Sequence, residues 1–399
     1  MTGVVLPILH VFLAFLKLGC IAFGGPVAHL GYFQEEFVRK RQWLSEAAYA
    51  DLIALCQFLP GPASSQVGFA IGRLRCGLPG AFAAWIGFTL PSACIMVAFA
   101  FGIAESVPGE AQGWIHGLKL AAVAVVANAI WNMAGKLCPD RERALIALFS
   151  AAFLVLFRDA FWQVAVIITG GVIGWTFLKR TNKDAPSRES PEPVSRRTGW
   201  PFLLAFGLLL VGSPLAGLLN VNEGILVAAR FYQAGSLVFG GGHVVLPLLE
   251  TFTVAEGWIG EDPFLAGYGA AQALPGPLFA FSAFLGTSLN HGPGGFPGGL
   301  LALIAIYLPS WLLVLGILPY WARLRNLETV QAALRGTNAA VVGLLLAAFY
   351  NPVWTAAVRN PLDLAFVLIG FAALRFAGIP PWALVPASAL AGSLLPNVA

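Results

Sequence analysis

Charged residues are scarce in this chain. Asp, Glu, Lys and Arg make up 11% of its 399 residues, against about a quarter in a typical soluble domain. Hydrophobic residues make up 58%, and the mean hydropathy is +0.79. This balance excludes an ordinary soluble protein and predicts a polytopic membrane protein in a lipid bilayer. The net charge of +4 lies mostly in loops, so it indicates membrane topology and no nucleic-acid partner.

Spacings typical of metal sites, nucleotide-binding loops and disulfide frameworks are also absent. The five cysteines form no C-x-x-C pair, and we expect them to be buried small hydrophobic residues. No G-x-x-x-x-G-K-[ST] loop occurs. The chain also lacks the clustered acids or histidines that a membrane enzyme acting on lipid or isoprenoid substrates would need. We therefore expect no cofactor, no metal and no enzymatic activity.

Two short signatures, by contrast, each occur twice. The first reads Phe23-Gly24-Gly25-Pro26 in one half of the chain and Phe239-Gly240-Gly241-Gly242 in the other. The second reads Gln57-Phe-Leu-Pro60-Gly61-Pro62 and Gln272-Ala-Leu-Pro275-Gly276-Pro277. Glycine and proline interrupt helices, and inside a membrane such backbone is tolerated only where protein or a cavity satisfies it. Tight helix packing and kinks are the alternative explanation, but corresponding interruptions in two halves favour a transporter's binding site, lined by the numbered residues.

One stretch of the chain differs in composition from its surroundings. Residues 179–198, KRTNKDAPSRESPEPVSRRT, are polar and rich in Pro and Ser, which is typical of a flexible linker. The linker separates an N-terminal repeat (1–178) from a single apolar segment (199–224), which reverses orientation, and a C-terminal repeat (225–399). The apolar pieces that flank the signatures are too short to span a bilayer comfortably, so we expect re-entrant or broken helix hairpins.

Basic residues lie in opposite loops of the two repeats. Loop 38–46 carries three of them, whereas its counterpart 253–263 carries only acidic charges. Loop 103–113 is acidic, whereas its counterpart 321–335 holds three arginines. Because basic loops stay in the cytoplasm, the members of each pair face opposite sides of the membrane. The sequence therefore predicts an all-α polytopic membrane protein with two inverted-topology repeats, a cytoplasmic N-terminus and linker, and broken hairpins that meet near the bilayer midplane.

The order, spacing and duplication of the signatures around a polar linker resemble the chromate ion transporter family in its long, two-domain form. The resemblance extends over residues 8–178 and 225–396. It implies a secondary transporter that exports chromate across the bacterial inner membrane, draws on the proton motive force and confers chromate resistance, with sulfate as a look-alike substrate. A sulfate or other anion carrier, an importer, a channel and the permease subunit of a larger complex stay open as alternatives, as does a homodimer.

The breaks also suggest how an oxyanion could be held. Pro26 and Pro62 stand where new helical segments begin, a position that favours proline. The backbone N–H groups that follow are free donors at the positive end of a helix dipole, which binds sulfate- and phosphate-like anions. Ser64 and Ser65 add hydroxyl donors there. The second repeat has Gly242 in place of Pro26 and a run of Leu, Phe and Ala in place of the serines, so we expect the first repeat to contribute more to substrate contact.

Two lysines lie inside apolar segments. An intramembrane lysine is a functional candidate, and Lys17 is predicted to compensate substrate charge. Extension of its ammonium group to the membrane surface, or pairing with Glu35 or Glu36, is the alternative. Lys119 lies near the outer end of its segment, where extension to the surface is favoured. Gln233 occupies the position of Lys17 in the second repeat.

Other polar residues near the breaks suggest ligand contact or proton coupling. Gln57 and Gln272 each precede a Pro-Gly-Pro break, where a buried amide could bind substrate or hold unwound backbone. A histidine can titrate at physiological pH, and carboxylates in these segments could also exchange protons, although each could equally be a hydrogen-bonded interfacial residue. The proton-coupling candidates are Glu35, Glu36, Asp51, His243 and Glu250, with His29 beside them.

Overall fold

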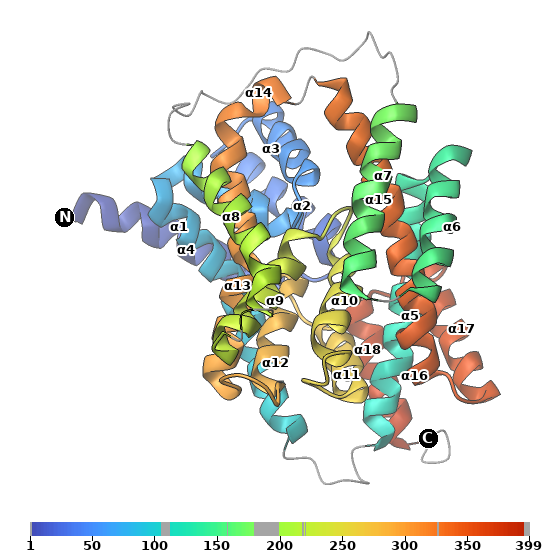
Figure 1. The fold of residues 1–399 in the computed structure, drawn as a ribbon. Coiled ribbons are helices and arrows are strands. Elements are labelled where there is room, and N and C mark those ends of the chain that lie inside the picture. Colours follow the sequence, from blue (N-terminus) through green and yellow to red (C-terminus); the bar gives the residue numbers. More distant parts are fainter. Residues whose placement is uncertain are drawn as a thin grey trace.

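The computed structural model describes residues 2–104, 112–157, 159–178, 199–217, 219, 221–324 and 327–394. Every regular element in these ranges is a helix (Figure 1). The predicted fold class, an all-α polytopic membrane protein with a duplicated architecture, is confirmed. The predicted linker, 179–198, lies outside the described residues.

In the first repeat, helices end where the signatures begin. Helix α1 (Thr2–Ile21) stops before Phe23, and α3 (Glu46–Phe58) stops before Pro60. The remaining elements are α2 (Gly25–Phe33), η1 (Gln34–Lys40), α4 (Ala63–Ala104), α5 (Gln112–Leu137), α6 (Arg141–Leu156) and α7 (Ala160–Phe177). Helix α4 changes direction at Cys76 and Gly77, where the backbone angles are non-helical. This kink separates the two segments that the sequence predicts there.

The second repeat follows helix α8 (Trp200–Ala216) and has the same order of elements. It comprises α9 (Glu223–Ser236), η3 (Gly242–Val244), α10 (Val245–Leu249), η4 (Glu250–Val254), α11 (Glu261–Gln272), η5 (Leu278–Ala280), α12 (Phe281–Ser288), α13 (Gly295–Ile317), η6 (Leu318–Tyr320), α14 (Trp321–Leu324), α15 (Glu328–Ala348), η7 (Phe349–Trp354), α16 (Thr355–Ala357), α17 (Pro361–Arg375) and α18 (Pro381–Leu394). Elements η1 and η4 are both π-helical and occupy equivalent positions. The duplication therefore extends beyond the signatures.

Equivalent elements of the two repeats lie toward opposite ends of the molecule. Figure 1 shows α3 and α14 near one end, and α11, α12 and α16 near the other. Helix α11 is the counterpart of α3, because each ends at a Gln-x-Leu-Pro-Gly-Pro signature. The two repeats therefore run in opposite senses, as the loop charges predict.

The repeats interlace and do not form two separate bodies. A first bundle combines α1 and α4 with α9, α12 and α13, and α8 packs against α9 and α13. A second bundle combines α5 with α17 and α18, and α15 with α6 and α7. Figure 1 shows the first bundle on the left and the second on the right, with α2, α3, α10 and α11 between them. Each bundle therefore contains helices from both repeats.

Glycines bring helices of the second bundle into backbone contact. A Cβ atom on Gly336 of α15 would lie 2.0 Å from the carbonyl oxygen of Gly170 in α7. A Cβ atom on Gly117 of α5 would lie 2.1 Å from the carbonyl oxygen of Ser388 in α18. Small residues at such crossings allow membrane helices to pack closely. Both helix pairs therefore depend on a glycine that allows the two backbones to approach closely.

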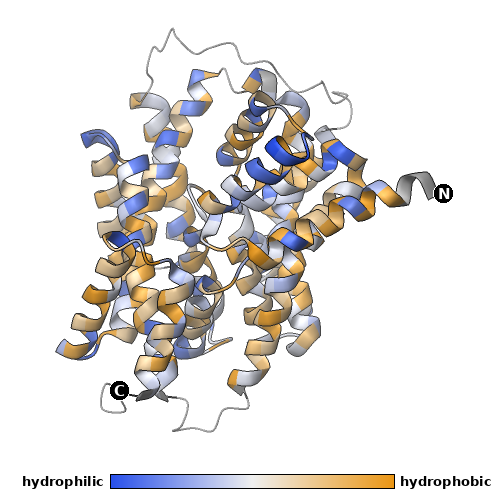
Figure 2. Cartoon of the chain, turned by 180° about the vertical axis from the view of Figure 1, so that it is seen from behind, coloured by the Kyte–Doolittle hydropathy of each residue, from blue (hydrophilic) through white to orange (hydrophobic). Residues whose placement is uncertain are grey.

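Several helices are long and apolar enough to cross a membrane. They are Ala63–Ile103, Gly113–Leu137, Ala160–Phe177, Gly295–Tyr320 and Glu328–Ala357. Large apolar side chains such as Phe101 and Phe177 are exposed on them, and Figure 2 shows hydrophobic residues along most helices. Exposed apolar surface on this scale fits contact with lipid. The chain is therefore a multi-pass membrane protein.

The cysteines differ from the prediction that they are buried. Cys56 is buried, whereas Cys20 of α1 and Cys94 of α4 are exposed. Both exposed cysteines lie on apolar helices. A small hydrophobic side chain can face lipid there as readily as it can face protein, so the expected burial is right for Cys56 and wrong for Cys20 and Cys94.

Candidate functional site

The helix breaks pair crosswise between the two repeats. The backbone N–H of Gly61 donates to the carbonyl of Val238 at 2.7 Å, and that of Gly276 donates to the carbonyl of Ala22 at 2.9 Å. Val238 and Ala22 directly precede the two Phe-Gly-Gly signatures. Each Pro-Gly-Pro break therefore bonds to the Phe-Gly-Gly break of the other repeat. These bonds satisfy carbonyl groups near the interrupted helix ends, as backbone inside a membrane requires.

The two Phe-Gly-Gly breaks also lie next to each other. A Cβ atom on Gly242 would lie 3.9 Å from Cγ of Pro26 and 3.7 Å from Cδ2 of Leu278. Leu278 follows the second Pro-Gly-Pro break. The breaks thus form one cluster, and Figure 1 shows the adjoining helices α2 and α10 between the two bundles. The structure brings together the signature residues that the sequence predicts to line the substrate site.

Glycine is required where the crosswise bonds form. The φ angles are +121° at Gly61 and +92° at Gly276, a region that other residues rarely adopt. A Cβ atom on Gly61 would lie 2.3 Å from Oγ of Ser310, and one on Gly276 would lie 3.0 Å from Oγ of Ser92. Any side chain at either glycine would therefore strain the backbone and displace a serine of the other repeat.

Those two serines belong to a third repeated signature that the sequence interpretation missed. Leu90-Pro91-Ser92 lies in α4 and Leu308-Pro309-Ser310 in α13, at equivalent positions of the two repeats. Each serine lies beside the Pro-Gly-Pro break of the other repeat. The duplicated tripeptide is visible in the sequence. Proline is common in membrane helices, however, and the crosswise packing is what connects it to the breaks.

His29 holds two parts of the first repeat together. Its Nε2 lies 3.1 Å from the carbonyl oxygen of Ala22, and its Nδ1 lies 3.2 Å from Oγ of Ser64. Because a carbonyl only accepts, Nε2 carries the proton, and the neutral ring then accepts from the Ser64 hydroxyl at Nδ1. His29 and Ser64 are both buried. The hydroxyl of Ser64 thus orients His29, while His29 binds a carbonyl freed by the first break.

Six side chains meet between the start of α4 and the middle of α13, around a void too small to hold a water molecule. They are Ser65, Gln66, Phe69, Tyr307, Ser310 and Trp311. Oγ of Ser65 lies 3.5 Å from Oη of Tyr307, which is a long hydrogen bond. The Gln66 side-chain amide donates to the carbonyl of Pro60 at 2.7 Å. The indole Nε1 of Trp311 and Oε1 of Gln66 are buried and have no hydrogen-bond partner among the described residues.

The first turns after the breaks differ between the repeats. The N–H of Gln66 donates to the carbonyl of Pro62 at 3.0 Å, an α-helical bond, whereas that of Ala280 donates to Pro277 at 3.0 Å, a 3-10 bond. The other pair of breaks shows the same difference, because α2 begins with Pro26 in its first turn and η3 begins as a 3-10 turn. Longer α-helices carry the larger dipole and the better-aligned N–H groups, which favours the first repeat as the anion-binding one.

The two glutamines before the Pro-Gly-Pro breaks differ in exposure. Gln57 is exposed, as are Gly24 and Gly240 in the other breaks. Nε2 of Gln272 is buried and has no partner in the described part of the chain. A polar side chain that is exposed between apolar segments is costly in lipid.

Lys17 lies away from these contacts. Its Nζ is 3.5 Å from Oε2 of Glu36, whose other oxygen accepts from Arg41 at 2.8 Å. The Lys17 side chain is 56% exposed, whereas that of Glu36 is 8% exposed. The pairing alternative named for Lys17 is thus the geometry that the structure shows, and charge compensation of a substrate stays a prediction.

The candidate proton-coupling residues lie at separate places. Glu35 pairs with Arg39 and Lys40 on the surface of η1. Asp51 is buried in α3 and accepts from Nε1 of Trp321 at 3.2 Å. Trp321 in turn contacts Phe58 of the first Pro-Gly-Pro signature, with ring centroids 5.3 Å apart, whereas Glu35 and Glu36 pair with basic residues of their own segment and with Lys17.

In the second repeat, His243 is the candidate nearest to a break. Its Nδ1 lies 2.8 Å from Oη of Tyr268 in α11. Glu250 lies at the start of η4, where Oε2 accepts from the hydroxyl of Thr251 at 3.4 Å. The proton-coupling residues named from the sequence therefore do not form one cluster, and their role stays a prediction.

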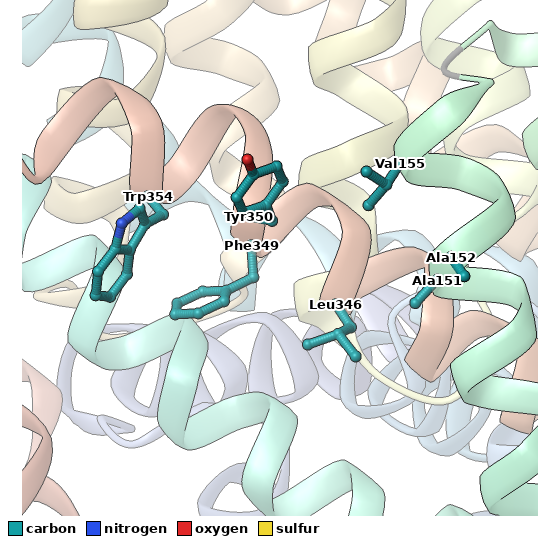
Figure 3. Close-up of a pocket in the computed structure, with 7 residues that line it drawn as sticks. All are labelled: Ala151, Ala152, Val155, Leu346, Phe349, Tyr350 and Trp354. Carbon is teal, nitrogen blue, oxygen red and sulfur yellow. The ribbon is translucent and has the colours of Figure 1, made fainter.

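A larger cavity lies elsewhere, between α6 and the end of α15 with η7 (Figure 3). Its volume is about 440 Å³, and it is lined by Ala151, Ala152, Val155, Leu346, Phe349, Tyr350 and Trp354. Aliphatic and aromatic side chains from the two elements face one another across it. Such a surface offers little to an oxyanion and much to an apolar chain, so the break cluster remains the candidate site.

Comparison with known proteins agrees with this duplicated site. A family model described as "Chromate transporter" matches residues 9–175 and again residues 225–393. No solved structure matches the chain. The two matched ranges coincide with the two repeats of the fold and include all four breaks.

Individual relatives match over nearly the full length. The "Probable chromate transport protein" of Synechococcus elongatus is 29% identical over 90% of this chain and 87% of its own length. The "Chromate transport protein" of Pseudomonas aeruginosa is 27% identical over 88% and 82%, respectively. That of Cupriavidus metallidurans is 26% identical over 95% and 90%. With both repeats matched by the family model, the chain belongs to the chromate transporter family.

Proposed function

We propose that this protein is a secondary transporter that exports chromate across the bacterial inner membrane, driven by the proton motive force, and thereby confers chromate resistance. The observation that carries the proposal is the crosswise pairing of the breaks, with Gly61 bonded to Val238 and Gly276 bonded to Ala22. Corresponding broken helices in inverted repeats are where transporters bind their substrates. The proposal assigns transport without catalysis, cofactor or metal, and places the N-terminus and the linker in the cytoplasm.

The chemistry of the cluster suits a tetrahedral dianion. Helices α2 and α4 begin at the breaks. The N–H groups of their first turns lie at the positive ends of the helix dipoles, where an anion binds favourably. Ser65, Tyr307 and Trp311 add neutral donors beside the start of α4. Neutral donors bind an anion without burying a permanent positive charge, which would be costly in lipid. A dianion held in this way can be released again.

Sulfate has the same shape and charge as chromate, so the donors named here would bind both. The names of the relatives favour chromate. Competition therefore belongs in the first experiment. Inside-out membrane vesicles should accumulate labelled chromate when their interior is acidic. Unlabelled sulfate should then be added at increasing concentrations, with and without the pH gradient.

Two variants test whether chromate transport depends on the breaks. Gly61→Val places a side chain against Ser310 at a positive φ, whereas Gly207→Val in α8 meets no atom within 4 Å. We expect the Gly61 variant to lose chromate accumulation and the Gly207 variant to retain it at equal amounts of membrane-inserted protein. Wild-type accumulation by Gly61→Val would contradict the site, and sulfate that fully protects against chromate uptake at equal concentration would make sulfate the better substrate.

A further inference from the structure

Helix α5 carries a second buried polar cluster, distinct from the breaks. His116 is 4% exposed and Asp363 of α17 is 0% exposed, and Nε2 of the histidine lies 2.8 Å from Oδ1 of the aspartate. One turn further along α5, Lys119 is 3% exposed, and its Nζ lies 2.6 Å from Oδ1 of Asp262 in α11. The sequence suggested extension of Lys119 to the membrane surface; in the structure its side chain is buried, and its ammonium group pairs with Asp262, whose side chain is 57% exposed.

The carboxylate of Asp363 is held firmly in place. Its Oδ2 accepts from the backbone N–H groups of Arg359 and Asn360 at 2.9 and 3.3 Å, and its own N–H donates to the side chain of Asn360. This capping box fixes the start of α17. The carboxylate is therefore fixed in position beside His116.

The bond to Asp363 uses only one of the two ring nitrogens of His116. With Nε2–H donating to Asp363, the neutral ring leaves Nδ1 as an acceptor. Nδ1 is buried and has no hydrogen-bond partner among the residues described. A proton can be added there without breaking the bond to Asp363. Histidine is the side chain whose unperturbed titration falls at physiological pH.

The carboxylates near α5 differ in burial. Asp363 is 0% exposed, whereas Glu261 and Asp262 at the start of α11 are exposed, with 57% of the Asp262 side chain accessible. Water therefore screens the charges of Glu261 and Asp262. A proton on His116 would form a buried ion pair with Asp363, and a buried charge without a partner is costly.

The other elements packed on α5 add little charge near this point. Helix α18, η7 and α16 contain no Asp, Glu, Lys or Arg in their described residues. In α15, Arg335 and Glu328 pair with each other. In α17, the remaining charge is Arg375, which lies over the ring of Trp131, far along α5. Among the residues that the structure describes, the charged groups near His116 are thus Asp363, Lys119, Asp262 and Glu261, with the exposed Arg359 beside Asp363.

Helices α5 and α11 run from the cluster to the breaks. A Cβ atom on Gly240 would lie 3.0 Å from Leu137, the last residue of α5, roughly 27 Å from Lys119 along the helix. Helix α11 runs from the ion pair at Asp262 to the break that follows Gln272. Two helices therefore lead from the cluster to two breaks of the second repeat.

We infer that His116 is the proton-binding site that couples this transporter to the proton gradient, with Nδ1 as the atom that gains and loses the proton. The proton enters from water on the acidic side, is carried on His116 beside Asp363, and leaves to water on the other side as the anion moves in the opposite direction. Asp363 acts as the positioning residue, because its carboxylate holds the imidazole through Nε2. The inference rests on the proposed transport function.

The test separates coupling from transport. Purified protein in liposomes should be assayed for chromate accumulation driven by an acidic interior, and for exchange of labelled against unlabelled chromate at equal pH on both sides. For His116→Gln, whose amide can still donate to Asp363, we expect gradient-driven accumulation to fall about tenfold or more and exchange to stay within about twofold of wild type. His10→Gln, at an exposed histidine of α1, is the matched control and should change neither rate.

A second variant tests the charge argument. Asp363→Asn removes the buried negative charge that His116 faces, so gradient-driven accumulation should fall while exchange persists. Undiminished gradient-driven accumulation by His116→Gln would overturn the inference. So would equal loss of both rates in a folded protein, since that would make the pair a structural tether between α5 and α17. Absence of chromate exchange in the wild type would instead contradict the proposed function.

Discussion

The two repeats share a backbone design and differ in side-chain chemistry. Both place glycines at positive φ in the breaks, and both donate a glycine N–H to the other repeat. The first repeat then begins α-helices with prolines and buried hydroxyls, whereas the second begins 3-10 turns with apolar residues. Duplication thus preserved the geometry that satisfies broken backbone. The side chains around the breaks differ, and the first repeat has more hydrogen-bond donors there.

The largest expected effect tests the shared geometry. Gly276→Val should reduce chromate accumulation by about 100-fold, as Gly61→Val should, because a β-branched residue at positive φ costs a few kcal/mol and breaks a crosswise bond. Accumulation in vesicles at matched protein levels provides the measurement, with Gly207→Val as control. Normal transport by Gly276→Val would show that the second repeat does not need the same backbone.

A smaller effect should separate the repeats. Ser65→Ala removes a hydroxyl beside the start of α4. We expect about a tenfold loss of transport at low chromate concentration, which corresponds to one lost hydrogen bond. Ser282 of the second repeat donates to the carbonyl of Phe279 at 2.7 Å within its own helix. Ser282→Ala should therefore leave transport nearly unchanged. Equal losses for the two variants would contradict the proposal that the first repeat contributes more to substrate contact than the second.

The serines of the third signature sharpen the same comparison. Ser310 lies 3.4 Å from the amide of Gln66, beside the start of α4, whereas Ser92 donates to the carbonyl of Thr89 at 3.0 Å. Ser310→Ala should raise the chromate concentration for half-maximal transport about threefold, since its hydrogen bond is long and weak. Ser92→Ala should shift it less. A larger shift for Ser92→Ala would assign substrate contact to the second repeat.

The smallest expected effect concerns Lys17. Lys17→Gln gives the first repeat the residue type that the second has at Gln233. Because Lys17 is half-exposed and paired with Glu36, we expect about a twofold loss of transport, the order of a surface ion pair. Lys17→Arg, which keeps the charge, is the control. A loss of substrate binding comparable with that of Ser65→Ala would place Lys17 in the anion path after all.

Much of this architecture is readable from the residues. The duplicated signatures located the breaks, and opposite loop charges predicted the inverted orientation, because glycine, proline and basic residues have strong local effects. The polar partners were not readable in the same way. The burial of Lys119 and the contacts of Ser92 and Ser310 with the Pro-Gly-Pro breaks were missed, since each depends on a helix from the other repeat.

The sequence by itself determined where helices stop, which segments are apolar and that the two halves correspond. These properties follow from backbone preferences and hydrophobicity, which act over a few residues. Only the tertiary structure decided that the breaks pair crosswise, that helices of both repeats share each bundle, and that His116 meets Asp363 inside the protein. Those contacts join residues far apart in the chain. They form because a buried carbonyl or charge in a membrane must find its partner wherever the packing supplies one.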